Sequence, residues 1–380
     1  MEFGTGVRLD KVEWAALPGE RWRNAGCNAR LGVHGKAVAV SLVRITAGGI
    51  QAFGWSVLTH DRAGALLGQP LKAMFTTEGR VRPEYFDLEF PLLDWLGRVN
   101  SQPVYRLVAP ASFEDTPGPF SVPCYDTSFY FDDLHLNDDK AAVELMQAQA
   151  QEGLSRGHRA FKIKVGRGAF YMPLNEGLQR DIAVVNGIRE TAGSSATLMI
   201  DANNGYNFNL IKDLLLRTRP ANIFWLEEPF HEDAVLYKHL KEWLAAEQLG
   251  VLLADGEGHP DPDLLIWAEA GLVDIIQYDL RYYGFERWLA LGPVLDAAGV
   301  RSAPHNYGGL YGNYASAHIA PAIRGFLFVE WDGGFAAGLD DTAYRIKDGR
   351  VMVPDRPGFG LELDDKHFSG QVRLAGWSVA

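Results

Sequence analysis

From Ser121 onward, short apolar runs alternate with amphipathic stretches. The runs that we interpret as strands cover 121–130, 159–165, 197–202, 223–228, 251–256, 275–279, 301–304 and 326–331. Apolar residues at helical spacing lie between them, for example over 138–156 and 285–298. Strands that alternate with helices favour parallel βαβ units. Eight strands separated by seven helices predict a closed barrel, although the spacing also permits an open doubly wound sheet.

The two ends of the chain have a different pattern. Residues 37–46 and 50–57 predict a hairpin around the turn Ala47-Gly48-Gly49, and 83–98 predicts a helix. Thr116-Pro-Gly-Pro119 is typical of a linker. After Trp331 the chain becomes Gly-rich and then turn-rich, so we expect an extended tail that packs on the N-terminal region.

Composition narrows the class of protein. The 380 residues suffice for a barrel and a smaller domain, and 47% hydrophobic with 22% charged residues is typical of a globular chain. A net charge of −12 argues against nonspecific nucleic-acid binding. Two cysteines predict no disulfide framework, which favours the cytoplasm. The sequence predicts neither a signal peptide nor a membrane helix, and we expect a homo-oligomer.

Two lysines stand two residues apart in Phe161-Lys-Ile-Lys-Val-Gly. On a strand, Lys162 and Lys164 point to the same side, which in a barrel strand can be the interior. Two neighbouring ammonium groups suit an anion, and each should lower the pKa of the other. In isolation the motif is more typical of two solvated surface lysines.

Carboxylates end three successive predicted strands. Asp201 ends Leu198-Met-Ile-Asp, Glu227 ends Ile223-Phe-Trp-Leu-Glu, and Glu257 follows Leu252-Leu-Ala-Asp-Gly. Any one of them fits an N-cap of the next helix. Three in a row behind apolar strands indicate instead a common site for Mg²⁺, which prefers hard oxygen ligands. Asp255 competes with Glu257 for the third position.

The later strands add an acid–base pair. Asp279 ends Ile275-Ile-Gln-Tyr-Asp, and His305 follows Arg301-Ser-Ala-Pro. Neighbouring strand ends would place the carboxylate on the imidazole, fix its tautomer and raise its pKa. Glu330 in Phe328-Val-Glu-Trp-Asp completes the ring of charged strand ends, and Asn203 is a candidate substrate ligand in a turn.

Together these motifs resemble the enolase superfamily in its mandelate racemase/muconate lactonizing subgroup. The resemblance rests on the Lys-x-Lys strand, on Ile200-Asp-Ala-Asn, Trp225-Leu-Glu-Glu-Pro and Asp255-Gly-Glu, on the Asp279–His305 pair, and on Pro354-Asp-Arg-Pro-Gly-Phe-Gly. It implies a modified TIM barrel, (β/α)7β, at 119–334. It also implies an α+β capping domain made of residues 1–118 and completed by 335–380. The subgroup usually carries Gly-Glu at the third ligand strand, which favours Glu257.

The resemblance also implies a reaction. Mg²⁺ on Asp201, Glu227 and Glu257 would stabilise an enediolate formed when the proton α to a carboxylate is removed. Lys162 and Glu330 would bind that carboxylate, while Lys164 and His305, oriented by Asp279, would act as acid and base. Dehydration of a sugar acid to a 2-keto-3-deoxy acid is the leading expectation, racemisation or epimerisation of a 2-hydroxy acid is second, and a non-catalytic binding or structural member is the alternative of another class.

One segment departs from the subgroup. Where members commonly carry a Gly pair after the strand-end Asp, this chain has Leu280-Arg-Tyr-Tyr-Gly-Phe. Arg281 in that segment is a candidate substrate ligand. We expect further specificity from the loop near 22–34, which carries Arg21, Arg23, Arg30 and His34.

Overall fold

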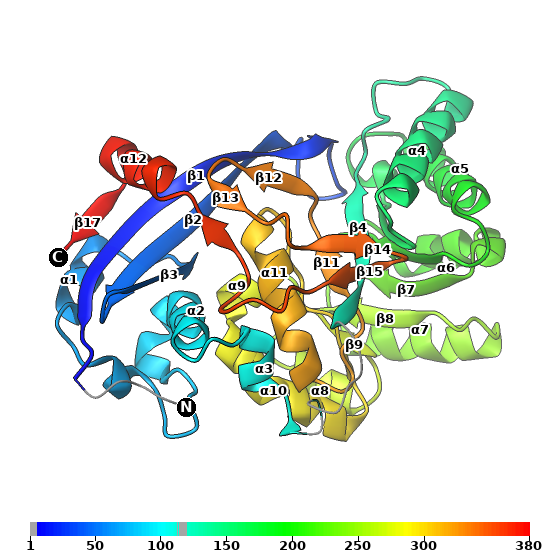
Figure 1. The fold of residues 1–380 in the computed structure, drawn as a ribbon. Coiled ribbons are helices and arrows are strands. Elements are labelled where there is room, and N and C mark those ends of the chain that lie inside the picture. The colour runs from blue at the N-terminus through cyan, green and yellow to red at the C-terminus, as the bar shows by residue number, and fades with distance from the viewer. Residues whose placement is uncertain (1–5, 112, 114–119) are drawn as a thin grey trace.

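The computed structural model describes residues 6–111, 113 and 120–380. Its largest part is a ring of parallel strands from β4 to β11, covered by helices such as the green α4 to α7 in Figure 1. Neighbouring strands follow the order β10-β9-β8-β7-β6-β5-β4, and β11 pairs in parallel with β4. A parallel bridge between Ser302 and Phe326 brings β10 to the segment before β11. The ring therefore closes, which confirms the predicted barrel over the open sheet.

The strands and helices of the barrel lie close to their predicted positions. The strands are β4 (Ser121–Phe129), β5 (Ala160–Lys164), β6 (Thr197–Asp201), β7 (Ile223–Glu227), β8 (Leu252–Asp255), β9 (Ile275–Ile276), β10 (Arg301–Ser302) and β11 (Val329–Trp331). The helices are α4 (Asp139–Ser155), α5 (Leu174–Ala192), α6 (Phe208–Arg217), α7 (Ala234–Ala246), α8 (Leu264–Glu269), α9 (Leu280–Tyr283), α10 (Phe285–Ala298) and α11 (Leu310–Ile319). Inward-facing side chains fill the barrel below its rim, namely Tyr125, Ala160, Met199, Trp225, Ala254, Ile275 and Ala303.

A second, antiparallel sheet caps one side of the barrel (Figure 1, blue). Its three N-terminal strands are β1 (Leu9–Ala25), β2 (Gly35–Ala47) and β3 (Ile50–Trp55), and it packs on α2 (Glu89–Val99). Two shorter helices, α1 (His60–Leu66) and α3 (Val104–Val108), complete this region. The predicted hairpin is therefore confirmed as β2 and β3. The predicted helix over 83–98 begins later, because 83–88 forms a 3-10 helix (Pro83–Leu88).

The C-terminal segment returns to both parts of the molecule. Strands β12 (Gly334–Ala336) and β17 (Trp377–Val379) pair with β1, whereas β15 (Arg350–Met352) pairs with β14 (Arg345–Lys347) and with barrel strand β4. The short strands β13 (Leu339–Asp340) and β16 (Glu362–Leu363) pair with each other. The expectation of an extended tail is wrong for α12 (Asp365–Ala375). This helix is capped by Asp364, whose side chain accepts a hydrogen bond from the His367 amide.

Two predictions are not decided by these observations. The expected linker 116–119 lies outside the described residues, and the domain boundaries at 118 and 334 remain a proposal supported by the pairing of the tail with β1. Within the described ranges, no helix is long and apolar enough to cross a membrane.

Asp94 joins the cap to the tail. This buried side chain of α2 accepts hydrogen bonds from the amides of Phe53 (3.0 Å) and Phe359 (2.9 Å) and pairs with Arg98 (2.7 Å). Removing it leaves two buried donors and a cation without their partner. We expect Asp94→Ala to lower the free energy of unfolding by about 3–5 kcal/mol in urea denaturation.

Asp365→Ala is the matched control. Asp365 also pairs with an arginine, Arg44, at 2.5 Å, but its side chain is 74% exposed, so its loss should cost less than about 1 kcal/mol. Equal losses in the two variants would contradict the role given to Asp94.

Candidate active site

The register of the parallel strands brings the charged residues to one rim of the barrel. Lys164 on β5 pairs with Asp201 on β6, and Asp201 pairs with Glu227 on β7. Side chains alternate between the two faces of a strand, so these three continue the inward-facing rows that begin below with Ala160, Met199 and Trp225. The same alternation brings Lys162 inward. The carboxyl ends of barrel strands are where active sites of this architecture lie.

Glu257 reaches the rim by a different route. Ala254 faces the barrel interior, so regular alternation would direct both Asp255 and Glu257 outward. Asp255 does point away from the rim and accepts a hydrogen bond from Tyr237 of α7. Between them Gly256 has a φ of +126°, a conformation that disfavours other residues, and after this turn Glu257 points inward. The two candidates for the third carboxylate are thus separated by one backbone turn.

The structure brings the three predicted metal ligands together. Carboxylate oxygens of Asp201, Glu227 and Glu257 lie within 4.8 Å of one another, and all three side chains are largely buried. Nearby cations balance these charges: Lys162 Nζ lies 2.7 Å from Glu227 and 3.6 Å from Asp201, and Lys164 pairs with Asp201. Buried, converging carboxylates that need positive charge fit a hard divalent cation such as Mg²⁺.

The expected fall in lysine pKa is wrong. Burial lowers the pKa of Lys164, but the carboxylates of Asp201, Glu257 and Glu227 together outweigh burial and leave the pKa above its ordinary value. For Lys162, burial is outweighed by Glu227 and Glu330, and the pKa lies well above the usual range. The carboxylates facing each lysine are closer and more numerous than the sequence motif alone suggested.

Glu227 is held by partners that the sequence analysis missed. Its Oε2 accepts hydrogen bonds from Trp225 Nε1 (3.2 Å) and Gln277 Nε2 (2.9 Å). Burial and the neighbouring Asp201 raise the pKa of Glu227 to about 8. Gln277 stands two residues before Asp279 on the inward face, so strand alternation was the signal that would have found it.

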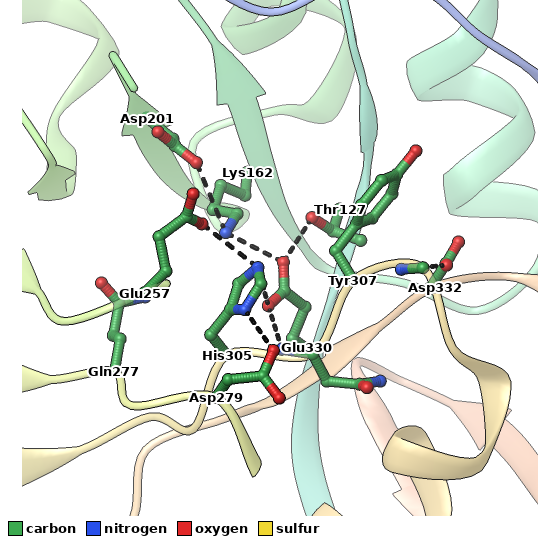
Figure 2. Close-up of polar contacts among 12 residues, drawn as sticks. Thr127, Lys162, Asp201, Glu257, Gln277, Asp279, His305, Tyr307, Glu330 and Asp332 are labelled. Atoms are coloured by element: carbon green, nitrogen blue, oxygen red, sulfur yellow. Dashed lines mark hydrogen bonds and ion pairs between the residues drawn. The ribbon is translucent and has the colours of Figure 1, made fainter. Parts of the chain in front are cut away.

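His305 and Asp279 meet as predicted (Figure 2). His305 Nδ1 lies 3.0 Å from Asp279 Oδ2, and its Nε2 lies 3.1 Å from Glu257 and 3.9 Å from Glu330. Burial lowers the pKa of His305, but Glu257, Glu330 and Asp279 outweigh burial and raise it to about 9. The other oxygen of Asp279 accepts from the amides of Arg281 and Tyr282, so this residue also caps α9.

Glu330 lies between Lys162 and the His305 loop. It contacts Lys162 Nζ at 2.9 Å and accepts hydrogen bonds from Thr127 (2.6 Å) and from the Asn306 amide (2.7 Å) (Figure 2). Burial raises its pKa, but Lys162 and His305 outweigh burial, so the pKa of Glu330 lies below the usual range. Glu330 is therefore an anion that fixes the position of Lys162.

A cavity of about 480 Å³ opens onto this rim. It is lined by Asn28, Arg30, Leu31, His34, Tyr130, Lys164, Glu257, Gly258, His259, Asp279, Tyr282, His305 and Tyr307. The cavity thus lies between the barrel rim and the cap loop 26–34. Its volume suits a small organic ligand.

Three predicted contributors to binding lie elsewhere. Arg281 does not line the cavity, because its guanidinium donates to the Tyr307 carbonyl at 2.7 Å and packs over Trp55. Arg21 pairs with the buried Asp332, and Arg23 pairs with Glu152. Both border a neighbouring cavity of about 530 Å³ that holds none of the three clustered carboxylates.

Asn203 is directed at carboxylates. Its Nδ2 donates to Glu228 at 2.8 Å and to Glu257 at 3.3 Å, and its backbone has a φ of 41°. It borders the carboxylate cluster but is not among the residues that line the cavity. Its placement supports a role in holding the metal ligands, and its predicted contact with substrate remains a prediction.

Comparison with known proteins gives consistent results. The sequence model of the family described as enolase C-terminal domain-like matches residues 145–367. A crystal structure of galacturonate dehydratase from Geobacillus sp., complexed with D-galacturonate and 5-keto-4-deoxy-D-galacturonate, has a TM-score of 0.95 and 49% identity, covering 98% of this chain and 99% of that one. A variant of the Geobacillus enzyme complexed with Mg has a TM-score of 0.96 at 49% identity, with 98% of each chain covered.

Two more distant curated relatives are also dehydratases. Arabinonate dehydratase from Saccharolobus solfataricus is 24% identical over 282 residues, which cover 73% of this chain and 69% of that protein. D-xylonate dehydratase from Haloferax volcanii is 25% identical over 327 residues, covering 82% of this chain and 74% of that protein.

The geometry around Gly256 predicts which of two acids binds the metal. Glu257→Gln should weaken Mg²⁺ binding by at least the ~10–100-fold that loss of an outer partner of a metal site typically costs. Asp255→Asn, the matched control, should weaken it by less than about tenfold, because Asp255 faces Tyr237. Isothermal titration with Mg²⁺ measures both affinities without turnover. The opposite order would assign the third ligand to Asp255.

Proposed function

The chain belongs to the enolase superfamily, in its mandelate racemase-like group, and on that premise we propose that it is a Mg²⁺-dependent dehydratase of a sugar acid, specifically of a hexuronate such as D-galacturonate. The observation that carries the proposal is one cavity bordered by Lys164, by the His305–Asp279 pair and by a member of the carboxylate cluster. Support for a hexuronate comes from 49% identity over 98% of the chain to a galacturonate dehydratase.

The metal site has a defined set of residues. Asp201, Glu227 and Glu257 would hold Mg²⁺, and their oxygen donors and burial fit that ion. When bound, Mg²⁺ supplies positive charge that holds the substrate carboxylate and competes with both lysines for the Asp201 carboxylate. Lys162 adds a buried cation fixed by Glu330 at 2.9 Å. Both charges favour the electron density that develops on the carboxylate when the α proton leaves.

The remaining residues move protons. In an open-chain hexuronate the α carbon is C5 and the adjacent C4 carries a hydroxyl. Neutral Lys164 Nζ takes the C5 proton, and the C–H electron pair moves onto the substrate carboxylate. When this pair returns, it forms the C5–C4 double bond as the C4–O bond breaks. His305, charged and oriented by Asp279 at 3.0 Å, donates a proton from Nε2 to the departing hydroxyl, which leaves as water. The enol then takes a proton at C4, and the product is a 5-keto-4-deoxy acid.

The same residues also permit racemisation, and the reaction product distinguishes racemisation from dehydration. Racemisation uses Lys164 and His305 on opposite faces of the α carbon but leaves the hydroxyls in place. A non-catalytic member would lack part of this constellation, whereas here each proposed role has a residue. That the enzyme is cytoplasmic and has no affinity for nucleic acid remains part of the proposal and rests on its two cysteines and its net charge of −12. A homo-oligomer also remains part of the proposal.

Turnover of D-galacturonate tests the proposal. With Mg²⁺ present, the purified protein should convert it to a 5-keto-4-deoxy acid. This product can be detected by mass spectrometry and by a colour reaction for an α-keto acid. In D₂O the product should carry deuterium at C4. Chelation should abolish turnover, and added Mg²⁺ should restore it. Full activity of the metal-free protein, or deuterium at C5 of recovered substrate epimers without loss of water, would contradict dehydration.

The roles of Lys164 and of the His305–Asp279 pair can be tested separately. His305→Asn should stop dehydration but keep exchange of the C5 proton, because Lys164 remains, while Lys164→Ala should lose both. Asp279→Asn should lower kcat by about 10²–10⁴-fold, the usual contribution of an acid–base group, with little change in Mg²⁺ affinity. NMR follows exchange and a coupled assay follows kcat. Rapid dehydration by His305→Asn would remove His305 from the leaving-group role.

A further inference from the structure

Arg281 lies in the segment that departs from the subgroup, at the start of α9 and two residues after Asp279. Its side chain is only 9% exposed, and its Nη2 donates to the Tyr307 carbonyl at 2.7 Å. Tyr307 in turn stands two residues after His305. Arg281 therefore connects the segment that carries the carboxylate of the His305–Asp279 pair to the loop that carries the imidazole.

Three cross-links join these two segments. Asp279 contacts the His305 imidazole at 3.0 Å, and the Leu280 amide donates to the His305 carbonyl at 3.0 Å. The third link is the hydrogen bond from Arg281 to Tyr307. The first two links end at His305 itself, whereas the third holds the chain that follows it. The position of the imidazole relative to α9 is therefore fixed at His305 and again two residues later.

The Arg281 guanidinium is closely surrounded. Its Cζ lies over the rings of Trp55, at 5.6 Å from the centroid, and of Tyr282, at 5.5 Å. A Cβ at Gly309 would overlap the guanidinium, so the loop can approach this closely because that position is glycine. Aromatic faces and a glycine contact restrict the orientation of the planar guanidinium, which keeps its donor directed at the carbonyl.

The charge of Arg281 also favours the ionised form of Asp279. Burial raises the pKa of Asp279, but the hydrogen bond and charge of His305 and the charge of Arg281 outweigh burial, so the pKa lies below its ordinary value. An ionised carboxylate at Nδ1 fixes the ring orientation and leaves Nε2 as the nitrogen that can donate a proton to a substrate.

We propose that Arg281 is a positioning residue for proton delivery, which ties the loop after His305 to α9 and so keeps Nε2 directed at the leaving hydroxyl. The inference rests on the proposed function, because it takes His305 to donate that proton. Arg281 acts through His305 and Asp279 and does not itself touch the substrate. Loss of its hydrogen bond should therefore impair the step that uses His305 and spare the step that uses Lys164.

Arg281→Met tests the separation of these two steps, because it keeps an apolar stem and removes the donor and the charge. The kcat for dehydration of D-galacturonate should fall roughly 10–100-fold, since a misplacement of about 1 Å can cost on the order of 10²-fold, while KM changes by less than about threefold. Exchange of the C5 proton in D₂O, which uses Lys164, should persist at about the rate of His305→Asn. Arg281→Lys keeps a charged donor and should recover most of kcat.

Arg189→Met is the matched control. Arg189 also donates to backbone carbonyls, those of Gly193 (2.7 Å) and Ala221 (2.8 Å). These residues precede β6 and β7, at the end of the barrel opposite the charged rim. Its loss should leave exchange and dehydration within about twofold of the wild-type rates. Circular dichroism and Mg²⁺ titration establish that each variant is folded.

Two further measurements test whether Arg281 acts through the His305–Asp279 pair. In an Asp279→Asn background, Arg281→Met should lower kcat by less than about threefold, because the pair that it positions is already broken. In the Mg²⁺-loaded wild type, the Nδ1 proton of His305 is bonded to a carboxylate and should give a downfield proton NMR resonance, assigned by its loss in His305→Asn. That resonance should broaden or disappear in Arg281→Met.

The outcomes separate this inference from the proposed function. Wild-type protein that fails to dehydrate D-galacturonate overturns the proposed function. Active wild-type protein combined with an unchanged kcat in Arg281→Met overturns the role of Arg281 alone. A parallel loss of exchange and dehydration would indicate damage to the whole site, and full additivity with Asp279→Asn would indicate an independent effect. Either result would also overturn the role of Arg281.

Discussion

Mutual repulsion of three converging carboxylates is the constraint on which the rest of the site depends. Asp201, Glu227 and Glu257 lie within 4.8 Å of one another, and at an effective dielectric constant near 20 each pair of full charges repels by on the order of 3 kcal/mol. Burial adds to that cost, which is why the pKa of Glu227 is raised to about 8. The chain offsets it with Lys162 and Lys164. Every charged group at the rim is thus positioned relative to this cluster, and the same excess of negative charge provides the affinity for a divalent cation.

Backbone geometry sets which side chains face this cluster. In a barrel, alternation along each strand and parallel register between strands fix the inward-facing set at every level, so Lys164, Asp201 and Glu227 occupy one level without further specification. Glu257 is the exception, because it lies beyond β8 and requires the positive φ of Gly256 to turn inward. A Cβ at that position would also lie 2.9 Å from the Tyr278 ring. The conformational freedom of one glycine thus completes the metal site.

This geometry explains what the sequence alone predicted. Barrel strands and strand-end residues were predictable because alternation and apolar runs are local signals, and α10 matches its predicted bounds. Strand β1 was missed because Pro18 and Gly19 interrupt its pattern. Pro18 lies opposite Ala39 of β2 and has no N–H to donate to the ladder. The raised lysine pKa and the orientation of Arg281 depend on partners that lie far away in the sequence. Such contacts leave no periodic signal in the chain.

The reacting groups and the rest of the cavity lining come from different elements of the fold, and these elements pack tightly against each other. Most of the charged groups come from strand ends. The rest of the cavity lining comes largely from the cap loop 26–34, which also carries Arg30, and from Tyr130 and Tyr307 in the segments after β4 and β10. Ala29 of that loop packs so closely on the turns after β5 and β6 that a Cβ at Gly166 or Gly205 would lie 2.8 or 2.5 Å from its own. Those turns follow Lys164 and Asp201 in the sequence. The contact with Ala29 therefore fixes the position of the cap loop relative to the reacting groups. The cap loop therefore borders the cavity from a position that is fixed by contact with the turns after Lys164 and Asp201.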